Sequence, residues 1–209
     1  MALHLTDHPL VTHRVAELRQ PTTDPHRFRV LTGELAAMLA YEAARGLATD
    51  AVKVPTPLGT AEAKVLSRPR PLIVPILRAG LGMLDATLET IPTAGVALLG
   101  LRRNEETLEP AIYADTVQAE LNGCDVFLVD PMLATGGSLA FAAAHVRARG
   151  AGRLHALSIV AAPEGIERVQ AACPDIELWP AVVDPGLNDV GYIVPGLGDA
   201  GDRLFGPLD

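Results

Sequence analysis

The central part of the chain alternates short apolar runs with longer segments of helical periodicity. The apolar runs predict strands at 72–77, 95–101, 126–129, 154–161 and 176–183. The segments between them predict helices at 81–91, 139–149 and 163–172. Buried strands separated by single helices indicate an α/β fold with a mainly parallel sheet flanked by helices. Ligands bind such sheets beyond the carboxyl ends of the strands.

The N-terminal residues follow a different pattern, which predicts an arm and a long helix. Residues 8–11 are expected to be extended because a proline restricts the residue before it, and residues 12–18 predict a short helix. Asp24 followed by Pro25 is a signal for a helix start. Apolar residues then recur at helical spacing, so this helix is predicted to run to about Gly46.

Residues 51–66 alternate apolar and polar side chains about a Pro-Leu-Gly turn, which predicts a β-hairpin before the main sheet. The chain shows no internal repeat and no low-complexity tract, and its 209 residues suit one α/β domain with an appendage. We therefore predict a single domain over 1–209, made of an N-terminal arm and helix (1–50), the hairpin (51–66), an α/β core (71–184) and a C-terminal segment, here called the hood (185–209).

The composition argues against several partners. The formal net charge of −8 makes a general nucleic-acid-binding surface an unfavourable interpretation, so any bound phosphate must be held by local arginines, backbone amides or a metal. Cys124 and Cys173 are far apart and form no metal or redox motif, which fits a reduced, cytoplasmic protein. No apolar run reaches membrane-spanning length and the first residues do not resemble a signal peptide, so no membrane association is expected.

The strand at 126–129 runs into Asp130 and then into a turn of small residues that includes Thr135, two glycines and Ser138. The N–H groups of such a turn and of the following helix converge where a phosphate can bind, and the two hydroxyls add donors. Asp130 cannot bind phosphate, but its carboxylate can accept hydrogen bonds from a vicinal diol. Phosphate plus diol describes a ribose 5-phosphate. Taken alone, the turn is equally compatible with an ordinary strand-to-helix connection.

Two other strand ends carry arginines. Arg78 follows the strand at 72–77, and the small residues Ala79 and Gly80 allow close backbone approach before a helix. The charged segment 102–110 is either a solvated loop or a mobile lid that brings Arg103 onto a phosphate and excludes water.

The hood is rich in glycine and contains a G-x-G-x-x-G pattern at 196–201. Only eight residues follow Gly201, so the helix and returning strand of a dinucleotide-binding unit cannot fit. Exposed backbone amides and a carbonyl instead suit a small planar molecule. Uracil, with two carbonyl acceptors flanking an N–H donor, is one molecule whose edge they could match. Cytosine would leave polar groups unpaired, at a cost of about 1–3 kcal/mol each.

Four segments resemble the loops of the uracil branch of the type I phosphoribosyltransferases, in the same order and spacing: PILRAG, RNEETLEP, VDPMLATGGS and GYIVPGLGDAGDR. Pro131 stands where most type I members have a second acid, as in the uracil branch. The turn AAPEG at 161–165 also matches and is predicted to be structural. The resemblance covers nearly the whole chain. It implies the type I phosphoribosyltransferase fold and the reaction of uracil with phosphoribosyl pyrophosphate, which yields UMP and diphosphate.

The resemblance also assigns residues. It implies Arg78, Arg103 and Asp130 as catalytic residues, the two arginines holding the pyrophosphate. It implies phosphoribosyl pyrophosphate contacts from Arg78, Arg103, Asp130, Pro131, Met132, Leu133, Ala134, Thr135, Gly136, Gly137, Ser138 and Asp199. It implies uracil contacts from Tyr192, Ile193, Gly198, Asp199 and Ala200. Mg²⁺ is expected to arrive with the phosphoribosyl pyrophosphate and not in a protein cage. The role of Asp199, toward the Mg²⁺ complex or the base, is open.

Other interpretations remain at this stage. An enzyme of the same fold could use a purine base, but a purine site usually contains an aromatic side chain that stacks on the base, and the hood is instead rich in glycine. A non-catalytic regulator that binds RNA is a second alternative, which the acidic net charge disfavours. Pro185 stands where the family pattern has Gln, and the hairpin diverges. The arm and long helix favour a homodimer or higher homo-oligomer. Members of the family can respond to GTP, and no residue here decides for or against a GTP effector.

Overall fold

A mainly parallel sheet forms the centre of the molecule. In the computed structural model, which describes residues 2–103 and 110–207, this sheet has nine strands. Its main order is β1 (Ala2–Leu3), β11 (Glu177–Val183), β10 (Leu154–Ala161), β8 (Val126–Val129), β4 (Leu72–Leu77), β6 (Leu99–Arg103) and β7 (Pro110–Asp115). Two short strands, β5 (Gly95–Val96) and β9 (Met132–Leu133), pair with β4 and β10. Every pair is parallel except β6–β7.

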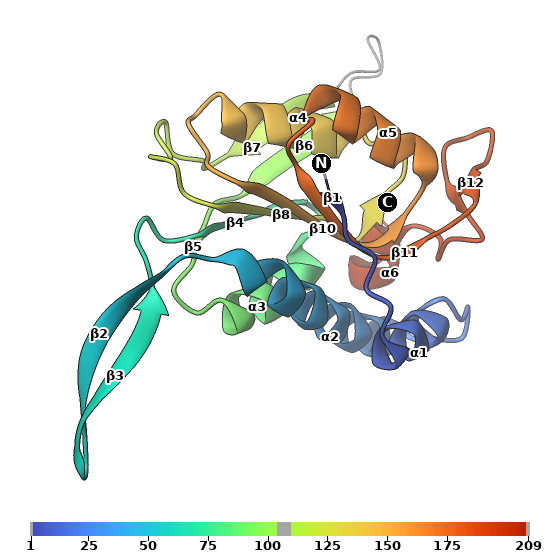
Figure 1. Cartoon of the computed structure of the whole chain (residues 1–209). Coiled ribbons are helices and arrows are strands. Elements are labelled where there is room, and N and C mark those ends of the chain that lie inside the picture. Colours follow the sequence, from blue (N-terminus) through green and yellow to red (C-terminus); the bar gives the residue numbers. More distant parts are fainter. Residues whose placement is uncertain (1, 104–109, 208–209) are drawn as a thin grey trace.

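Helices cover both faces of this sheet (Figure 1). On one face lie α4 (Gly137–Arg147) and α5 (Pro163–Ala172). On the other lie α1 (Pro9–Leu18), α2 (Pro25–Ala43) with the short 3₁₀ turn η1 (Ala44–Gly46), α3 (Leu81–Thr90) and α6 (Ala200–Phe205). The predicted α/β class, with a mainly parallel sheet between helices, is confirmed. None of the helices in the described ranges is long and apolar enough to cross a membrane.

The strands are apolar on both sides because each side faces a separate core. In β8, Val126 and Leu128 pack into the cluster under α4 and α5, whereas Phe127 and Val129 pack into the cluster under α2. All four side chains are fully buried. Burial of an aliphatic or aromatic side chain of this size contributes about 1.5–3 kcal/mol. The sheet edge that carries the loops is therefore held on a rigid base.

The predicted hairpin forms a sheet of its own. β2 (Thr49–Thr56) and β3 (Gly59–Leu66) pair antiparallel, and Figure 1 shows them projecting away from the sheet and helices. Its strands begin two residues before the predicted range, and Leu58 at its tip is fully exposed.

The prediction for residues 8–11 was wrong. Residues 8–11 are not extended, because α1 already begins at Pro9. Only His8 is extended, and its Nδ1 accepts a hydrogen bond from the Leu10 N–H at 3.1 Å. A proline restricts the residue before it, while its own φ suits the first helical position. The same logic works at α2, where Asp24 caps the helix and accepts from the Arg27 N–H at 2.9 Å.

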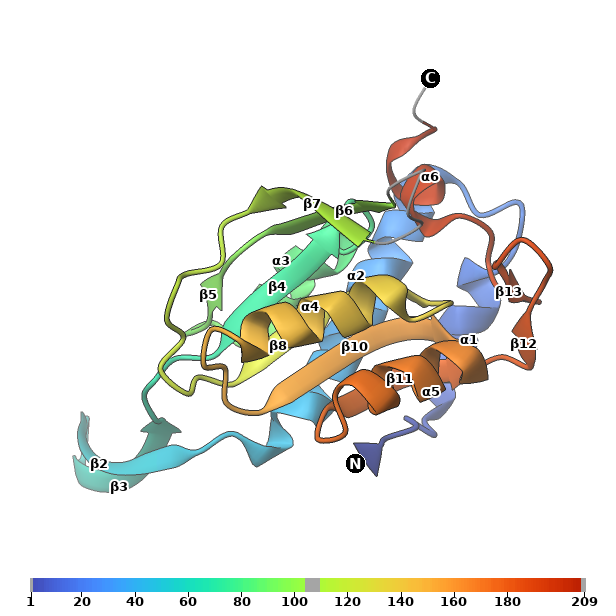
Figure 2. The same ribbon diagram turned by 90° about the horizontal axis from the view of Figure 1, so that it is seen from above.

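Several elements were not predicted. The run 95–101 is split into β5 and β6, and β7 returns antiparallel beside β6. The hood holds two short paired strands, β12 (Gly186–Leu187) and β13 (Ile193–Val194), followed by α6. Viewed from above, these hood elements lie beyond one end of the sheet (Figure 2).

Candidate functional site

The loops after β4 and β8 meet at the same edge of the sheet. These strands are parallel neighbours, with Pro75 opposite Val129. A Cβ atom on Gly80 would lie 2.4 Å from the Val129 carbonyl oxygen, so only glycine allows this approach. The loop that carries Arg78 is thereby pressed against the start of the loop that carries Asp130. The Leu77–Arg78 peptide bond is cis.

The loop after β8 presents a row of open backbone donors. Gly136 adopts the left-handed conformation (φ 74°) and precedes α4, which starts at Gly137, two residues before the predicted start. Within the described residues, none of the backbone N–H groups from Thr135 to Leu139 donates a hydrogen bond. Five consecutive open N–H groups around a helix N-terminus form a cradle for an anion.

A second turn supports this cradle from behind. A Cβ atom on Gly165, in the first turn of α5, would lie 2.2 Å from the Ala134 carbonyl oxygen. A Cβ atom on Gly136 would lie 2.6 Å from the Gly165 carbonyl oxygen. The Ala162 N–H donates to the Leu133 carbonyl at 2.8 Å. The turn at 161–165 therefore contacts the loop from Leu133 to Gly136 through backbone atoms.

The carboxyl group of Asp130 is partly buried and accepts one hydrogen bond in the described part of the structure. Its Oδ1 accepts a hydrogen bond from the Met132 N–H at 3.3 Å, and its own N–H donates to the Leu157 carbonyl at 3.2 Å. Burial of the carboxyl group, with a smaller contribution from the nearby Asp199 carboxylate, raises the pKa of Asp130 to about 7. Its carboxylate therefore lacks a full set of partners and is available to a ligand.

Arg78 connects the loop after β4 with the hood. Its Nη2 lies 3.4 Å from Asp202 Oδ1 on α6, and a Cβ atom on Gly201 would lie 3.6 Å from the same Nη2. The ion pair is largely open to solvent, so it is weak and can be replaced by a ligand.

The predicted uracil contacts of the hood gather around the start of α6. Asp199 caps this helix, and its Oδ1 accepts from the Asp202 N–H at 2.9 Å. Ile193 and Ala200 are buried, and Gly198 has a positive φ of 81°. A Cβ atom on the neighbouring Gly191 would lie 3.5 Å from Thr135 Cγ2, so the hood touches the anion cradle. The side chain of Tyr192 is 49% exposed.

The predicted lid is not tested by the structure. Arg103 is the last residue of β6, but its side chain and residues 104–109 lie outside the part of the structure that is described. The remaining members of the predicted loop, Pro131, Met132, Leu133 and Ser138, lie on the same strand-to-helix connection as Asp130.

The residues that hold the hood in place were missed by the sequence analysis. Glu164 accepts a hydrogen bond from the Leu187 N–H at 3.1 Å. Arg203 donates to the carbonyls of Leu18, Leu197 and Gln20 at 2.9, 3.0 and 2.8 Å. Most of these pairs join segments far apart in the chain, so a local sequence pattern does not predict them.

The donor set at this edge suits a magnesium ion that comes with a substrate. Mg²⁺ prefers oxygen ligands and retains several non-protein ones. The carboxylates of Asp130 and Asp199 are close enough for the charge on one to raise the pKa of the other. Among the described residues, no group of three His, Cys, Asp or Glu side chains is arranged to hold a metal. The two carboxylates therefore fit a partial contact to a substrate-bound ion.

Solved structures of similar shape define the class. The AQ2163 protein from Aquifex aeolicus matches over 98% of both chains, with a TM-score of 0.92 and 40% sequence identity. Adenine phosphoribosyl transferase from Trypanosoma brucei matches over 87% of this chain and 82% of its own, with a TM-score of 0.54. At 12% identity the second match shows the fold alone. The chain has the fold of the type I phosphoribosyltransferases, with open backbone donors in the loop after β8.

Sequence comparison gives the family. The family model described as uracil phosphoribosyltransferase matches residues 5–207. The uracil phosphoribosyltransferase of Beutenbergia cavernae is 49% identical over 209 residues, covering 99% of both chains. That of Streptomyces coelicolor is 49% identical over 211 residues, covering 100% of both chains. The chain belongs to the uracil phosphoribosyltransferase family, which confirms the predicted resemblance.

Proposed function

We propose that this protein is an enzyme that transfers the 5-phosphoribosyl group of phosphoribosyl pyrophosphate to uracil, giving UMP and diphosphate for pyrimidine salvage. The observation that carries this proposal is the row of open N–H groups from Thr135 to Leu139 directly beside Asp130. Membership of the family supports the choice of uracil as the base.

The loop from Asp130 to Ser138 binds the ribose 5-phosphate part of the substrate. Its open amides and the hydroxyls of Thr135 and Ser138 surround the 5′-phosphate, where the dipole of α4 adds a favourable potential. Asp130 accepts hydrogen bonds from the ribose diol. That role requires the ionised carboxylate, so diol binding lowers the pKa that burial has raised.

The reaction is driven by charge and position. Breaking the bond to pyrophosphate leaves positive charge on the ribose and negative charge on the leaving group. Arg78 stabilises that negative charge, and Arg103 adds a second guanidinium from the lid. Asp130 and Asp199 would lie beside a Mg²⁺ ion that arrived with the substrate, and such an ion would supply further positive charge to the phosphate oxygens. The mechanism has no covalent enzyme intermediate, and catalysis comes from positioning and electrostatic stabilisation.

The hood binds the uracil base and selects it by hydrogen bonding. The backbone around Ile193, Gly198 and Ala200 provides the donors and acceptor for the uracil edge, with Tyr192 and Asp199 beside them. The contact between Gly191 and Thr135 supports this role, because it places the hood next to the ribose phosphate loop. A base bound there lies within reach of the sugar carbon that it must attack.

Product identification tests the proposal. The protein is incubated with labelled uracil, phosphoribosyl pyrophosphate and Mg²⁺, and the products are separated and weighed by mass spectrometry. UMP and diphosphate in equal amounts are expected. Absence of UMP at every protein concentration, with the protein folded, would refute the proposed reaction.

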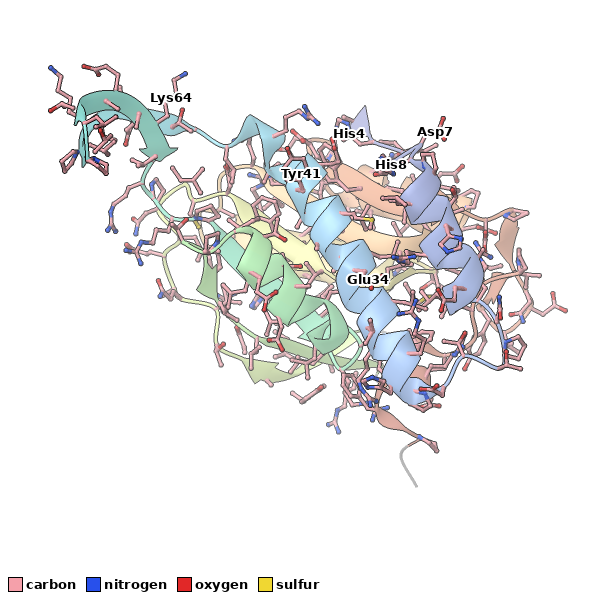
Figure 3. The ribbon with its side chains drawn as sticks, turned by 90° about the horizontal axis from the view of Figure 1, so that it is seen from below. His4, Asp7, His8, Glu34, Tyr41 and Lys64 are labelled. Atoms are coloured by element: carbon pink, nitrogen blue, oxygen red, sulfur yellow. The ribbon has the colours of Figure 1, made fainter. Side chains whose placement is uncertain are left out.

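We also propose that two copies of the chain associate as a homodimer. The hairpin β2–β3 pairs with no other described strand, and a groove of about 460 Å³ on the same side is lined by residues that include Leu10, Met38 and Tyr41. Figure 3 shows this side, with Tyr41 on α2 and Lys64 on the hairpin. Sedimentation equilibrium of the protein with and without the hairpin tip tests it.

Two further parts of the proposal rest on the sequence: the GTP effector on the family resemblance, and the cytoplasmic location on the pattern of the cysteines. GTP acts as an effector of the reaction, and the protein works in the cytoplasm. A GTP titration of uracil turnover tests the first, and cell fractionation tests the second.

A further inference from the structure

Arg168 lies beside the anion cradle but belongs to none of its motifs. Helices α4 and α5 run side by side above the sheet (Figure 2). Gly165 contacts the loop, and Arg168 is three residues further along α5, so both residues are on the face toward α4. A Cβ atom on Gly137 would lie 3.4, 3.5 and 3.7 Å from the Nη1, Cζ and Nη2 atoms of Arg168. The three similar distances place the guanidinium flat against the first residue of α4.

The guanidinium of Arg168 also has no partner in an ion pair among the described residues. Within the described residues the side chain of Arg168 makes no hydrogen bond and has no carboxylate within 4.0 Å, although its backbone belongs to α5. The three arginines between the end of α4 and the start of β10 are paired with carboxylates: Arg147 with Asp175 at 2.6 Å, Arg149 with Asp115 at 2.8 Å and Arg153 with Asp125 at 2.6 Å. Arg168 is exposed, and its unpaired guanidinium lies next to five open N–H groups, so it is free to bind an anion that these groups hold.

The acidic residues of the same helix do not meet this need. Glu164 is one turn before Arg168 but accepts from the Leu187 N–H at 3.1 Å, so it is committed to the hood. Glu167 is exposed and lies on a different face of the helix, because adjacent residues of a helix do not face the same side.

We infer that Arg168 is a further binding residue for the 5′-phosphate of the ribose substrate. The inference rests on the proposed function, because it takes the loop from Thr135 to Leu139 to be the phosphate site. The guanidinium supplies full positive charge at a cradle that otherwise offers neutral amides and hydroxyls. It does so from outside the loop, at the end of the substrate away from the bond that breaks. Arg168 therefore contributes to binding and leaves the chemical step unchanged.

Two arginine variants test the inference. In Arg168→Gln the charge next to the loop is lost, while Arg70→Gln loses the same charge at an exposed residue at the base of the hairpin, where no described ion pair forms. Calorimetric binding of ribose 5-phosphate to each full-length protein is compared with binding of inorganic pyrophosphate. We expect ribose 5-phosphate to bind about fivefold more weakly to Arg168→Gln only, with pyrophosphate binding unchanged. Arg168→Lys should recover part of the loss, because the point charge remains but the fork does not.

Turnover separates binding from chemistry. In Arg168→Gln the KM for phosphoribosyl pyrophosphate should rise by about the same factor, with kcat and the KM for uracil unchanged, and this KM should depend less steeply on salt. Equal ribose 5-phosphate affinity in Arg168→Gln and Arg70→Gln would overturn the inference.

The inference and the proposed function fail in different ways. If the unaltered protein binds ribose 5-phosphate but makes no UMP, the proposed reaction is wrong and the comparison of the two arginine variants still decides on Arg168. If the unaltered protein does not bind ribose 5-phosphate, the phosphate loop and Arg168 are both overturned.

Discussion

The guanidinium of Arg19 forms two hydrogen bonds to the carboxylate of Asp184, at 2.8 and 2.6 Å, across 165 residues of sequence. The same carboxylate accepts from the Gly196 N–H at 2.8 Å, and Arg19 also donates to the Gly196 carbonyl at 3.2 Å. One ion pair thus links the arm, the end of β11 and the glycine-rich part of the hood. The position of the proposed uracil site depends on the N-terminal arm.

Replacing Arg19 should therefore affect both stability and uracil binding. Asp184 is 5% exposed, so Arg19→Gln leaves a buried carboxylate without its ionic partner, at a cost of about 3–5 kcal/mol. Urea denaturation measures the loss, and the KM for uracil should rise more than the KM for phosphoribosyl pyrophosphate. Arg45→Gln removes an exposed ion pair with Glu42 and should cost less than about 1 kcal/mol. A similarly small loss of stability in both variants would show that the ion pair of Arg19 with Asp184 does not hold the hood in place.

Removal of Arg78 should damage turnover without unfolding the protein. Its ion pair with Asp202 is solvent-exposed, so Arg78→Ala should leave the unfolding transition nearly unchanged. A charge that stabilises the leaving pyrophosphate is worth more than tenfold in kcat. Steady-state kinetics with saturating uracil measure this, and the proposed role requires that binding of inorganic pyrophosphate weakens too. A near-normal kcat in Arg78→Ala would remove Arg78 from the mechanism.

Asp130→Asn should weaken phosphoribosyl pyrophosphate much more than uracil. The amide keeps the shape of the side chain but loses one of the two acceptor oxygens offered to the ribose diol, and it cannot carry charge. Separate KM values for the two substrates provide the measurement. An equal loss for both substrates would argue against the diol assignment.

The same residue gives a pH prediction for the unliganded protein. The pKa of Asp130 is raised from 3.8 to about 7, so the folded state binds the proton more tightly than the unfolded chain. The stabilising contribution is complete below pH of about 4 and is lost as pH rises through about 7. Urea denaturation from pH 4 to pH 8 should show Asp130→Asn gaining stability relative to the unaltered protein as pH rises. A difference in stability between the two proteins that stays constant with pH would show that the pKa of Asp130 is not raised.

Substrate binding should follow the opposite trend. Because the diol is bound by the ionised carboxylate, the affinity for ribose 5-phosphate should fall as pH drops below about 7. Asp130→Asn should bind weakly at every pH, without this added dependence. Titration of both proteins in the same buffers distinguishes the effect from protonation of the phosphate itself, which acts on both.

The backbone contact between α5 and the phosphate loop should be sensitive to a single methyl group. Gly165→Ala would place its Cβ atom 2.2 Å from the Ala134 carbonyl oxygen, so the loop must move. We expect ribose 5-phosphate affinity to fall at least tenfold, with a loss of stability of about 1–3 kcal/mol. Gly95→Ala is the control, because its Cβ atom would meet only a Leu72 methyl group at 3.5 Å. Equal behaviour of the two variants would show that the loop does not need this support.

Local patterns in the sequence accounted for most of the sheet and its covering helices. The strand ranges 72–77, 126–129 and 154–161 and the helix 163–172 match the structure residue for residue. Buried strands are short and mostly apolar, although β10 also contains His155 and Ser158, and Pro163 marks a helix start, so these signals are strong. The start of α1 was misplaced because the restriction before a proline was extended to the residues after it.

Long-range pairing could not be predicted. β7 forms only because the chain returns beside β6, and α6 has six residues inside a glycine-rich segment that reads as irregular. At the site, the resemblance of the motif pointed to the loop from Asp130 to Ser138. The residues that hold this loop and the hood in place come from distant parts of the sequence. The ion pair of Arg19 with Asp184 and the contact of Gly165 with Ala134 depend on residues that no local window contains.

The most direct test of the account is turnover of labelled bases with phosphoribosyl pyrophosphate and Mg²⁺. Uracil, cytosine, hypoxanthine and orotate are supplied in parallel to the same protein. The account predicts a nucleoside monophosphate from uracil alone, with one diphosphate released for each UMP. Turnover of cytosine or hypoxanthine equal to that of uracil would contradict the proposal that the hood selects uracil. Absence of product from all four bases would contradict the proposed reaction.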